Sequence, residues 1–211
     1  CSRALAADTV LSAAMLTVGS RHAAAQGTRP ASPARGAADL RRAIDGITTT
    51  ARVLIVGMHP DDDLPELSSW LSLGHNVETA YLSITRGEAG EDFNGTETGP
   101  SLGVVRVAET LNARRIDGAH QYFTRAFDVG AIRKANELFL TPGDTLDTDG
   151  WDRDSVVADI VTVIRAFRPQ VVVAVPGDTL AAGAGQHRAL MALLDSAFVA
   201  ADDSARFAVK P

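Results

Sequence analysis

The sequence predicts an α/β fold, a Rossmann-like and mostly parallel sheet with helices on both faces. Short apolar runs alternate with segments of helical apolar spacing, which is typical of a parallel sheet covered on both sides. Polar clusters follow three of these apolar runs, at His59 to Asp63, Arg86 to Glu88 and Asp178 to His187. Because ligands bind beyond the carboxyl ends of the strands in such sheets, we expect the functional site at that edge.

Composition limits the class of protein. The chain has 211 residues, of which 45% are hydrophobic, and this is enough for one sizeable core and one domain. A formal net charge of -6 argues against a nucleic-acid partner, because nucleic-acid binding needs a basic surface. The single cysteine, Cys1, excludes an internal disulfide framework. Beyond the N-terminal region, no segment approaches the roughly 18 consecutive apolar residues of a membrane span.

Residues 1–25 have the pattern of a signal segment. An apolar run from Ala4 to Ser20 follows Arg3 and leads to the small residues Ala23 to Ala25, as before a signal-peptidase site. The alternative is an ordinary amphipathic helix, which Asp8 within the run supports. From the signal pattern we expect an exported protein, periplasmic or extracellular.

A linker and an N-terminal helix are predicted for residues 26–50, and the main domain for residues 51–211. The domain begins with a strand at Arg52–Met58 and a helix at Pro65–Leu73, since proline suits a first helical turn and Gly74 a C-terminal cap. The same patterns predict strands at 77–85, 121–124 and 170–175, and helices at 101–116, 131–140, 152–167 and from 186 to about 201.

The helix at Ser101–Ile116 has two distinct sides. Its apolar residues recur near the helical period and predict the buried face: Val104, Val105, Ala108, Leu111 and Ile116. The opposite side carries Arg106, Glu109 and Arg114, and the spacing of Arg106 and Glu109 suits a solvated ion pair.

The first polar cluster has the chemistry of a metal site. His59, Asp62 and His187 supply two imidazoles and one carboxylate, a set that binds Zn²⁺ and leaves a position open for water. Asp61 is then a candidate general base for that water. The alternative is that these aspartates cap the helix that begins at Pro65, since aspartate is a favoured N-cap residue.

The wider pattern resembles the PIG-L/LmbE-like family of zinc-dependent N-acetylglucosaminyl deacetylases. The resemblance covers about Arg52 to Phe198, and its subtype is similar to the longer bacterial members. It is carried by Met58–Asp63 after the first strand, Leu82–Glu88 after the second, Arg106-x-x-Glu109, Thr79–Ser83, Ala113–Ala119, Gln121–Asp128 and the late His187.

The resemblance implies a role for each candidate residue. His59, Asp62 and His187 would be the ligands of one zinc ion per chain, with another divalent metal as the alternative. Asp61 would be the general base, and Arg86 would contact the substrate, a small N-acetylated sugar or glycoconjugate. The resemblance also implies an LmbE-like fold for the deacetylase-like domain.

Two residues depart from the family pattern. Asp63 stands where the family usually has glutamate, so the charge is retained on a shorter side chain. Ala184 stands three positions before His187, where the family has a histidine thought to stabilise the oxyanion. An alanine cannot donate a hydrogen bond, so slow turnover is expected unless another donor compensates.

The predicted function is a metal-dependent hydrolase that removes an N-acetyl group from an N-acetylglucosamine-type sugar or a related amide. The alternative is a non-catalytic or weakly active descendant that binds metal or carbohydrate. A nucleotide-binding domain is disfavoured, because the first strand leads into His-Pro-Asp-Asp and not into G-x-G-x-x-G. The chain ends at Pro211 without an evident terminal element, so a longer natural chain is part of this expectation.

Overall fold

A parallel sheet organises the computed structural model, which describes residues 36–90, 95–131, 134–141, 150–177 and 184–208. The strand order is β3-β2-β1-β4, and every neighbouring pair is parallel. The strands are β1 (Arg52–Gly57), β2 (Glu78–Ser83), β3 (His120–Phe123) and β4 (Val171–Val175). The predicted fold class is confirmed. The predicted signal segment, residues 1–25, lies outside the described residues.

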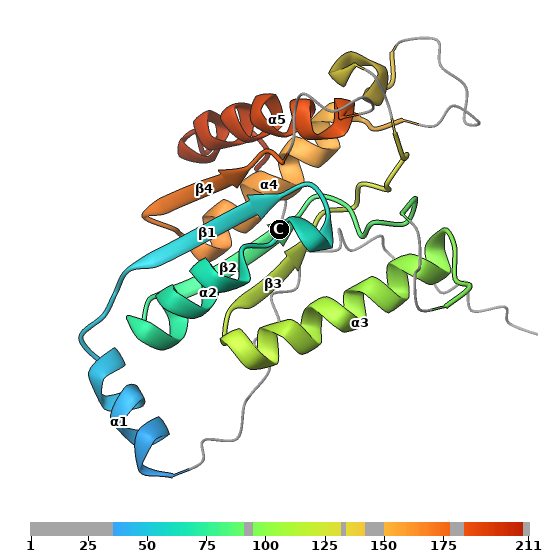
Figure 1. The fold of residues 1–211 in the computed structure, drawn as a ribbon. Helices are drawn as coiled ribbons and strands as arrows, with labels where there is room; N and C mark the ends of the chain where they lie inside the picture. Colours follow the sequence, from blue (N-terminus) through green and yellow to red (C-terminus); the bar gives the residue numbers. More distant parts are fainter. Residues whose placement is uncertain (1–35, 91–94, 132–133, 142–149, 178–183, 209–211) are drawn as a thin grey trace, which may run out of the picture.

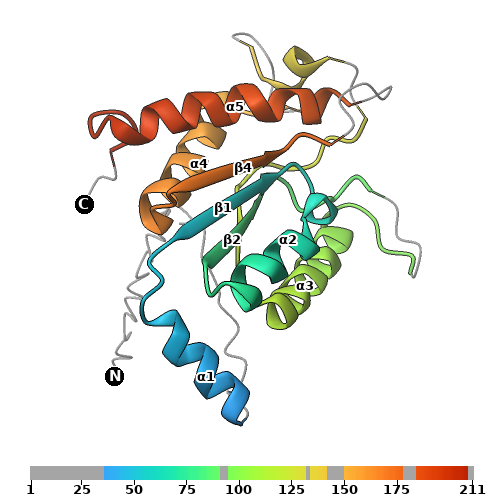
Figure 2. The ribbon, with the colours of Figure 1, turned by 60° about the vertical axis from the view of Figure 1, so that its left-hand side comes forward.

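Helices cover both faces of the sheet (Figure 1). In Figures 1 and 2, α2 and α3 lie on one face, and α4 and α5 on the other, while α1 lies beyond the start of β1. Their bounds are α1 (Ala37–Gly46), α2 (Pro65–Ser69), α3 (Pro100–Asp117), α4 (Arg153–Phe167) and α5 (Gly185–Asp202). In the described part of the chain, no helix combines the length and apolarity needed to cross a membrane.

The central strand β1 explains why the apolar runs are nearly continuous. Successive side chains of a strand point to opposite faces. Leu54 and Val56 join the larger core beneath α4 and α5, whereas Val53 and Ile55 join a smaller core with Tyr81 beneath α2. Both faces of β1 are thus buried, as the uninterrupted run Arg52–Met58 predicts.

Local sequence sets several helix ends. Gly118 adopts a left-handed conformation (φ 76°) and ends α3, and its N–H donates to the Arg114 carbonyl. The Asp152 carboxylate caps the start of α4 by accepting from the N–H of Ser155. The helix predicted at Pro65–Leu73 begins as α2 and continues as a π-helical turn at Trp70–Gly74. These boundaries agree with the prediction to within about two residues.

The helix predicted at Ala131–Leu140 is wrong. Within the described residues of this region, a short 3₁₀ helix at Ala135–Leu138 is the helical element. Phe139 then forms a bridge with Trp151, and the Leu140 N–H donates to the Trp151 carbonyl. Backbone pairing with a distant segment therefore replaces the helical hydrogen bonds that the local pattern favours.

The predicted buried face of α3 is also wrong. Val104 and Ile116 are 70% and 78% exposed, while Arg114 is fully buried. The Arg114 guanidinium binds two carboxylates, with Nη2 at 2.5 Å from Asp63 and 2.7 Å from Asp117. Burial of a cation is tolerated where carboxylates pair with it, and this pairing outweighs the apolar pattern of the helix.

Replacing Arg114 should destabilise the fold strongly. Arg114→Ala leaves the carboxylates of Asp63 and Asp117 without their buried partner, and we expect the free energy of unfolding to fall by about 3–5 kcal/mol. The matched control is Arg115→Ala on the same helix, where the side chain is exposed and bonds to Asn112, and a change within about 0.5 kcal/mol is expected. Urea denaturation measures both. Equal losses in the two variants would contradict the structural role of Arg114.

Candidate metal and active site

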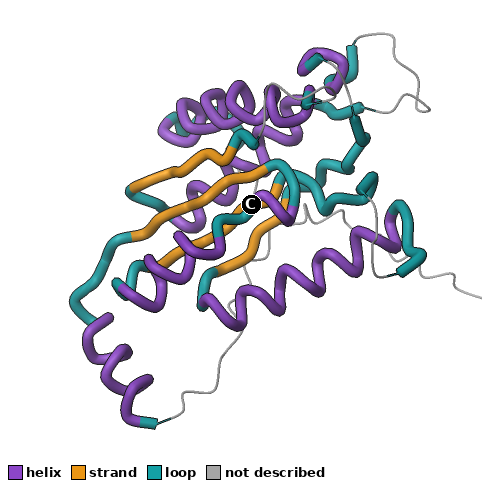
Figure 3. The backbone as a smooth tube through the Cα atoms, in the orientation of Figure 1, coloured by secondary structure: helices purple, strands orange, loops and turns teal. Residues whose placement is uncertain are grey.

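The candidate site lies where the chain changes direction across the sheet. His59 follows β1, and His187 lies in the first turn of α5, which follows β4. Along the chain β1 leads to β2 on one side, while β4 pairs with β1 on the other, so a topological switch point lies between β1 and β4. Figure 3 shows the loops that follow the strands gathered at this end of the sheet. Ligands bind at such points in open α/β sheets.

Ligand atoms of the three predicted metal-binding residues come together. One atom each from His59, Asp62 and His187 lies within 4.8 Å of the other two. His187 Nε2 and His59 Nδ1 lie 3.3 Å and 3.6 Å from the same oxygen, Asp62 Oδ2. Ligand atoms about 2.0–2.2 Å from a tetrahedral zinc lie roughly 3.3–3.6 Å from one another. The donor set and these two distances to Asp62 therefore fit a zinc ion.

The backbone holds Asp62 in place. Its Oδ2 accepts hydrogen bonds from the N–H groups of Met58 (3.0 Å) and His59 (2.8 Å), across the short 3₁₀ helix Pro60–Asp62. Burial raises the pKa of Asp62. Hydrogen bonds from His187 and from the His59 backbone lower it by more than burial raises it, so the pKa of Asp62 lies below its ordinary value. Asp62 is therefore an oriented carboxylate anion, as a cation ligand must be.

Two residues of neighbouring strands support the same loop. The Tyr81 hydroxyl, from β2, donates to the His59 carbonyl. Gly57 makes room for it, because a Cβ at Gly57 would collide with this hydroxyl and lie 2.8 Å from the Asp62 Cβ. The end of β1 is thus fixed to β2 immediately before the candidate ligands.

Asp128 is a site residue to which the sequence analysis assigned no role. It is buried after β3, and its Oδ2 lies 3.7 Å from His59 Nε2. Its Oδ1 accepts from Gln186 Nε2 (2.7 Å) and from the Gly130 N–H (2.9 Å). Burial raises the pKa of Asp128, but its interactions with His59 and Gln186 lower it well below the usual range. A carboxylate behind a histidine ligand orients the ring and leaves the other nitrogen for a metal.

The surrounding carboxylates favour positive charge at this point. Burial lowers the pKa of His59, but Asp128, Asp62 and Asp61 together raise it more, so the net pKa is raised. The negative charge of these carboxylates stabilises either a proton on His59 or a metal cation bound by it. The proton and the metal therefore compete for His59.

The three adjacent aspartates point to three different partners. Asp62 belongs to the metal cluster, and Asp63 binds the buried Arg114. Asp61 lies on the outer side, with its side chain 71% exposed and its Oδ2 3.7 Å from Arg106 Nη1. The glutamate-to-aspartate departure at position 63 therefore concerns the core of the fold and not the metal ligands.

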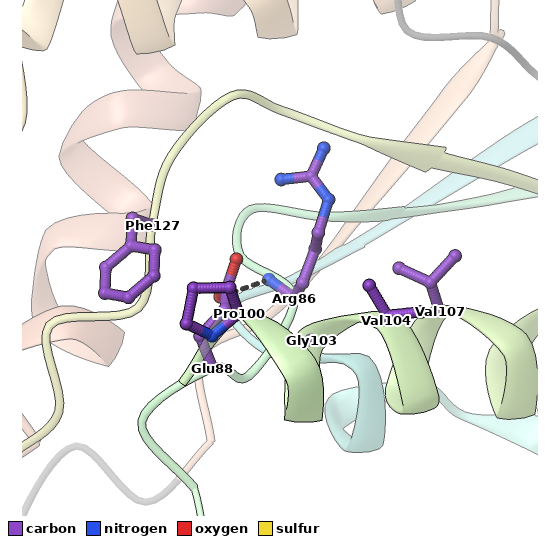
Figure 4. A pocket seen from close by; sticks show the side chains of 7 residues that line it. All are labelled: Arg86, Glu88, Pro100, Gly103, Val104, Val107 and Phe127. Carbon is purple, nitrogen blue, oxygen red and sulfur yellow. Dashed lines mark hydrogen bonds between the residues drawn. The ribbon is translucent and has the colours of Figure 1, made fainter. Parts of the chain in front are cut away.

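Arg86, the predicted substrate-contacting residue, is not part of the metal cluster. The Arg86 N–H donates to Glu88 (3.0 Å), and its guanidinium carbon lies 5.5 Å from the centre of the Phe123 ring. Arg86 and Glu88 line a pocket of about 370 Å³ against α3 (Figure 4). Arg86 thus borders a concavity formed against α3.

Two small residues lie close to His187. Gly177 has φ 62°, and a Cβ there would lie 2.6 Å from His187 Cδ2 and 2.9 Å from Nε2. The absence of a side chain at Gly177 lets the His187 ring reach Asp62. Ala184 is buried and forms the N-cap position of α5, but its methyl group offers no donor for an oxyanion.

Two solved structures share the fold. N,N'-diacetylchitobiose deacetylase from Pyrococcus horikoshii matches with a TM-score of 0.53 and 18% identity, over 74% of this chain and 52% of that chain. GalB, the 4-carboxy-2-hydroxymuconate hydratase from Pseudomonas putida KT2440, gives the same TM-score and identity, over 74% of this chain and 58% of that chain. At this identity the likeness shows the fold alone, and the two names show that one fold hosts different reactions.

Curated relatives are closer in sequence. The 1D-myo-inositol 2-acetamido-2-deoxy-alpha-D-glucopyranoside deacetylase of Kribbella flavida is 30% identical over 137 residues, or 58% of this chain and 45% of the relative. The protein of the same name from Geodermatophilus obscurus is 28% identical over 137 residues, or 60% and 46%. The chain spans about half the length of these relatives. The family model described as PIG-L, GlcNAc-PI de-N-acetylase, matches residues 54–198, which is well over half of the chain. The chain therefore belongs to the PIG-L family.

Proposed function

We propose that this chain is a zinc-dependent hydrolase that removes the N-acetyl group from an N-acetylglucosamine-type sugar. The observation that carries the proposal is the cluster of His59, Asp62 and His187, which gathers a zinc ligand set at the switch point of the sheet. Family membership and the names of the curated relatives support deacetylation as the reaction. A site of two imidazoles and one carboxylate leaves a coordination position open, as hydrolytic zinc sites do.

Zinc bound by these residues would acidify water and polarise the acyl oxygen of the amide. The protein supplies the proton transfers. Asp61 is adjacent to the ligand Asp62, and its exposed carboxylate is accessible to a substrate. In the proposal, Asp61 accepts the proton of the attacking water and later delivers a proton to the leaving amine. The Asp61 Oδ2 lies 3.7 Å from Arg106 Nη1, and this contact restrains the Asp61 side chain.

Arg86 is proposed to hold the sugar. Its guanidinium has several N–H donors that match the hydroxyl groups of a sugar, and the residue borders the pocket against α3. We also propose that residues 51–211 form the catalytic domain and that residues 1–25 direct export.

The rival function is a binding module that retains the ligands but has lost the oxyanion donor at Ala184. Turnover in the presence of bound zinc separates the two.

The role of Asp61 can be tested without removing the metal. Asp61→Asn should retain stoichiometric zinc and lose turnover by at least about 10²-fold, because an amide cannot accept the proton of the water. Amine release from N-acetylglucosamine and from the inositol glycoside named for the relatives measures activity, and elemental analysis measures zinc. Asp195→Asn, at an exposed position on α5, is the control and should change neither value. Undiminished activity in Asp61→Asn would remove Asp61 from the mechanism.

The packing of Gly177 against His187 gives a second test. Gly177→Ala places a methyl group on the His187 ring, so zinc affinity should fall by at least about tenfold, in the range seen when support around a metal ligand is altered. Gly36→Ala is the control, because Gly36 also has a positive φ (86°) but has open space around it. Competition with a chelator measures the affinity.

His187→Ala should lose most of the zinc, and full zinc content in that variant would exclude His187 as a ligand.

The alanine at position 184 predicts a gain of function. A missing oxyanion donor typically costs about 10²–10³ in kcat. We expect Ala184→His to raise kcat by at least about tenfold with unchanged zinc content, a conservative share of that loss because Ala184 is buried and the imidazole needs room. Ala184→Leu, which adds bulk without a donor, is the control. If Ala184→His binds zinc normally but is no faster on any sugar that the parent cleaves, the oxyanion explanation is wrong.

A further inference from the structure

We infer that the pocket between α3 and the loop after β3 is a subsite for an apolar substituent on the acetylated sugar. The inference deepens the proposed function and rests on it for the position of the sugar. The pocket has a volume of about 370 Å³, at the small end of the roughly 300–1,000 Å³ range of small-molecule sites. That volume suits one ring or a short alkyl group.

The loops that line the pocket also contact residues around the candidate metal site. Glu88 lies in its wall, and the Glu88 carboxylate accepts from the N–H of Asp128 (3.2 Å), the residue behind His59. Phe127, which forms the wall opposite α3, immediately precedes Asp128. A Cβ at Gly87 would lie 3.3 Å from Cδ of Pro60, so the same loop packs against the metal-binding segment. The loop that lines the pocket therefore also packs against the segment that carries the candidate ligands.

The base of the pocket is built tightly. Glu88 is buried, and its carboxylate is occupied by the N–H groups of Arg86 and Asp128. Gly103 of α3 lies against it, because a Cβ at Gly103 would be 2.8 Å from Glu88 Cγ. The buried carboxylate therefore serves to fix the loop, and it leaves apolar atoms to line the space.

The remaining lining is apolar and open to a ligand. Val104 and Val107 project from one side of α3, and Phe127 lies across from them (Figure 4). Val104 is 70% exposed and Phe127 is 47% exposed. Apolar side chains exposed around a concavity beside a reactive site favour a ligand with apolar surface.

The position of Arg86 indicates which part of the substrate reaches the pocket. The acyl carbon must lie at the metal ligands, and Arg86, which borders the pocket, is proposed to hold the sugar hydroxyls. The sugar then lies between the metal and the pocket. The group that extends past Arg86 is the substituent of the sugar, and the acyl chain remains at the metal.

The test compares two substituents that have the same ring size and differ in their hydroxyl groups. The substrates are the cyclohexyl α-glycoside and the myo-inositol α-glycoside of N-acetylglucosamine, the second being the compound named for the relatives. We expect kcat/KM to be at least about tenfold higher for the cyclohexyl glycoside, because a filled apolar pocket discriminates by this amount. N-hexanoylglucosamine, compared with N-acetylglucosamine, tests the acyl chain separately.

Variants on one helix locate the effect. The double variant V104S/V107S removes the apolar wall and should reduce the cyclohexyl preference at least about fivefold. Ile116→Ser is the control, since Ile116 is also an exposed apolar residue of α3 but does not line the pocket, and the preference should stay unchanged. Calorimetry with zinc-loaded Asp61→Asn measures the binding of both glycosides independently of turnover.

The outcomes separate the two proposals. If the wild-type protein releases no amine from any substrate, the proposed function fails, and calorimetry alone decides the subsite. Tighter binding of the cyclohexyl glycoside that weakens in the V104S/V107S background of Asp61→Asn supports the subsite. Equal cleavage or equal binding of the two glycosides overturns it. A preference for the hexanoyl group that disappears in V104S/V107S also overturns it, because the pocket would then hold the acyl chain.

Discussion

Mutual repulsion among Asp61, Asp62 and Asp63 is the constraint on which the site depends. Adjacent carboxylates at the end of a buried strand are tolerated when each has its own positive partner or donor. Asp62 receives two backbone N–H groups and faces the imidazoles, Asp63 binds Arg114 inside the fold, and Asp61 faces solvent near Arg106. One short segment thereby connects the core, the metal cluster and the substrate side.

The sequence predicted the parts of this arrangement that depend on local pattern. Strand positions follow from continuous apolar runs, and parallel strands bring the residues after β1 and β4 to one edge, so His59, Asp62 and His187 could be proposed as a group. The position of Asp61 beside a ligand made it a candidate base, and the resemblance to PIG-L/LmbE-like proteins implied the same role and added that of Arg86.

The rest depended on contacts between distant segments. The face of α3 was mispredicted because burial of Arg114 is decided by Asp63, 51 positions earlier in the chain, and helical periodicity contains no information about that partner. Asp128 was quoted in the family match but given no role, because its position behind His59 depends on the order of β1, β2 and β3 in the sheet. The short 3₁₀ helix at Ala135–Leu138 likewise reflects pairing with Trp151 and not local propensity.

The contact between Gly57 and Tyr81 has a consequence for how this family diverges. The Tyr81 hydroxyl occupies the space in which a side chain at Gly57 would lie, and it holds the His59 carbonyl from there. A larger residue at position 57 requires both the loss of the ring at position 81 and a shift of the Asp62 Cβ, and a smaller residue at position 81 leaves the His59 carbonyl without its donor. The two positions should therefore covary among related sequences: a pair that substitutes together, through intermediates that bind metal poorly.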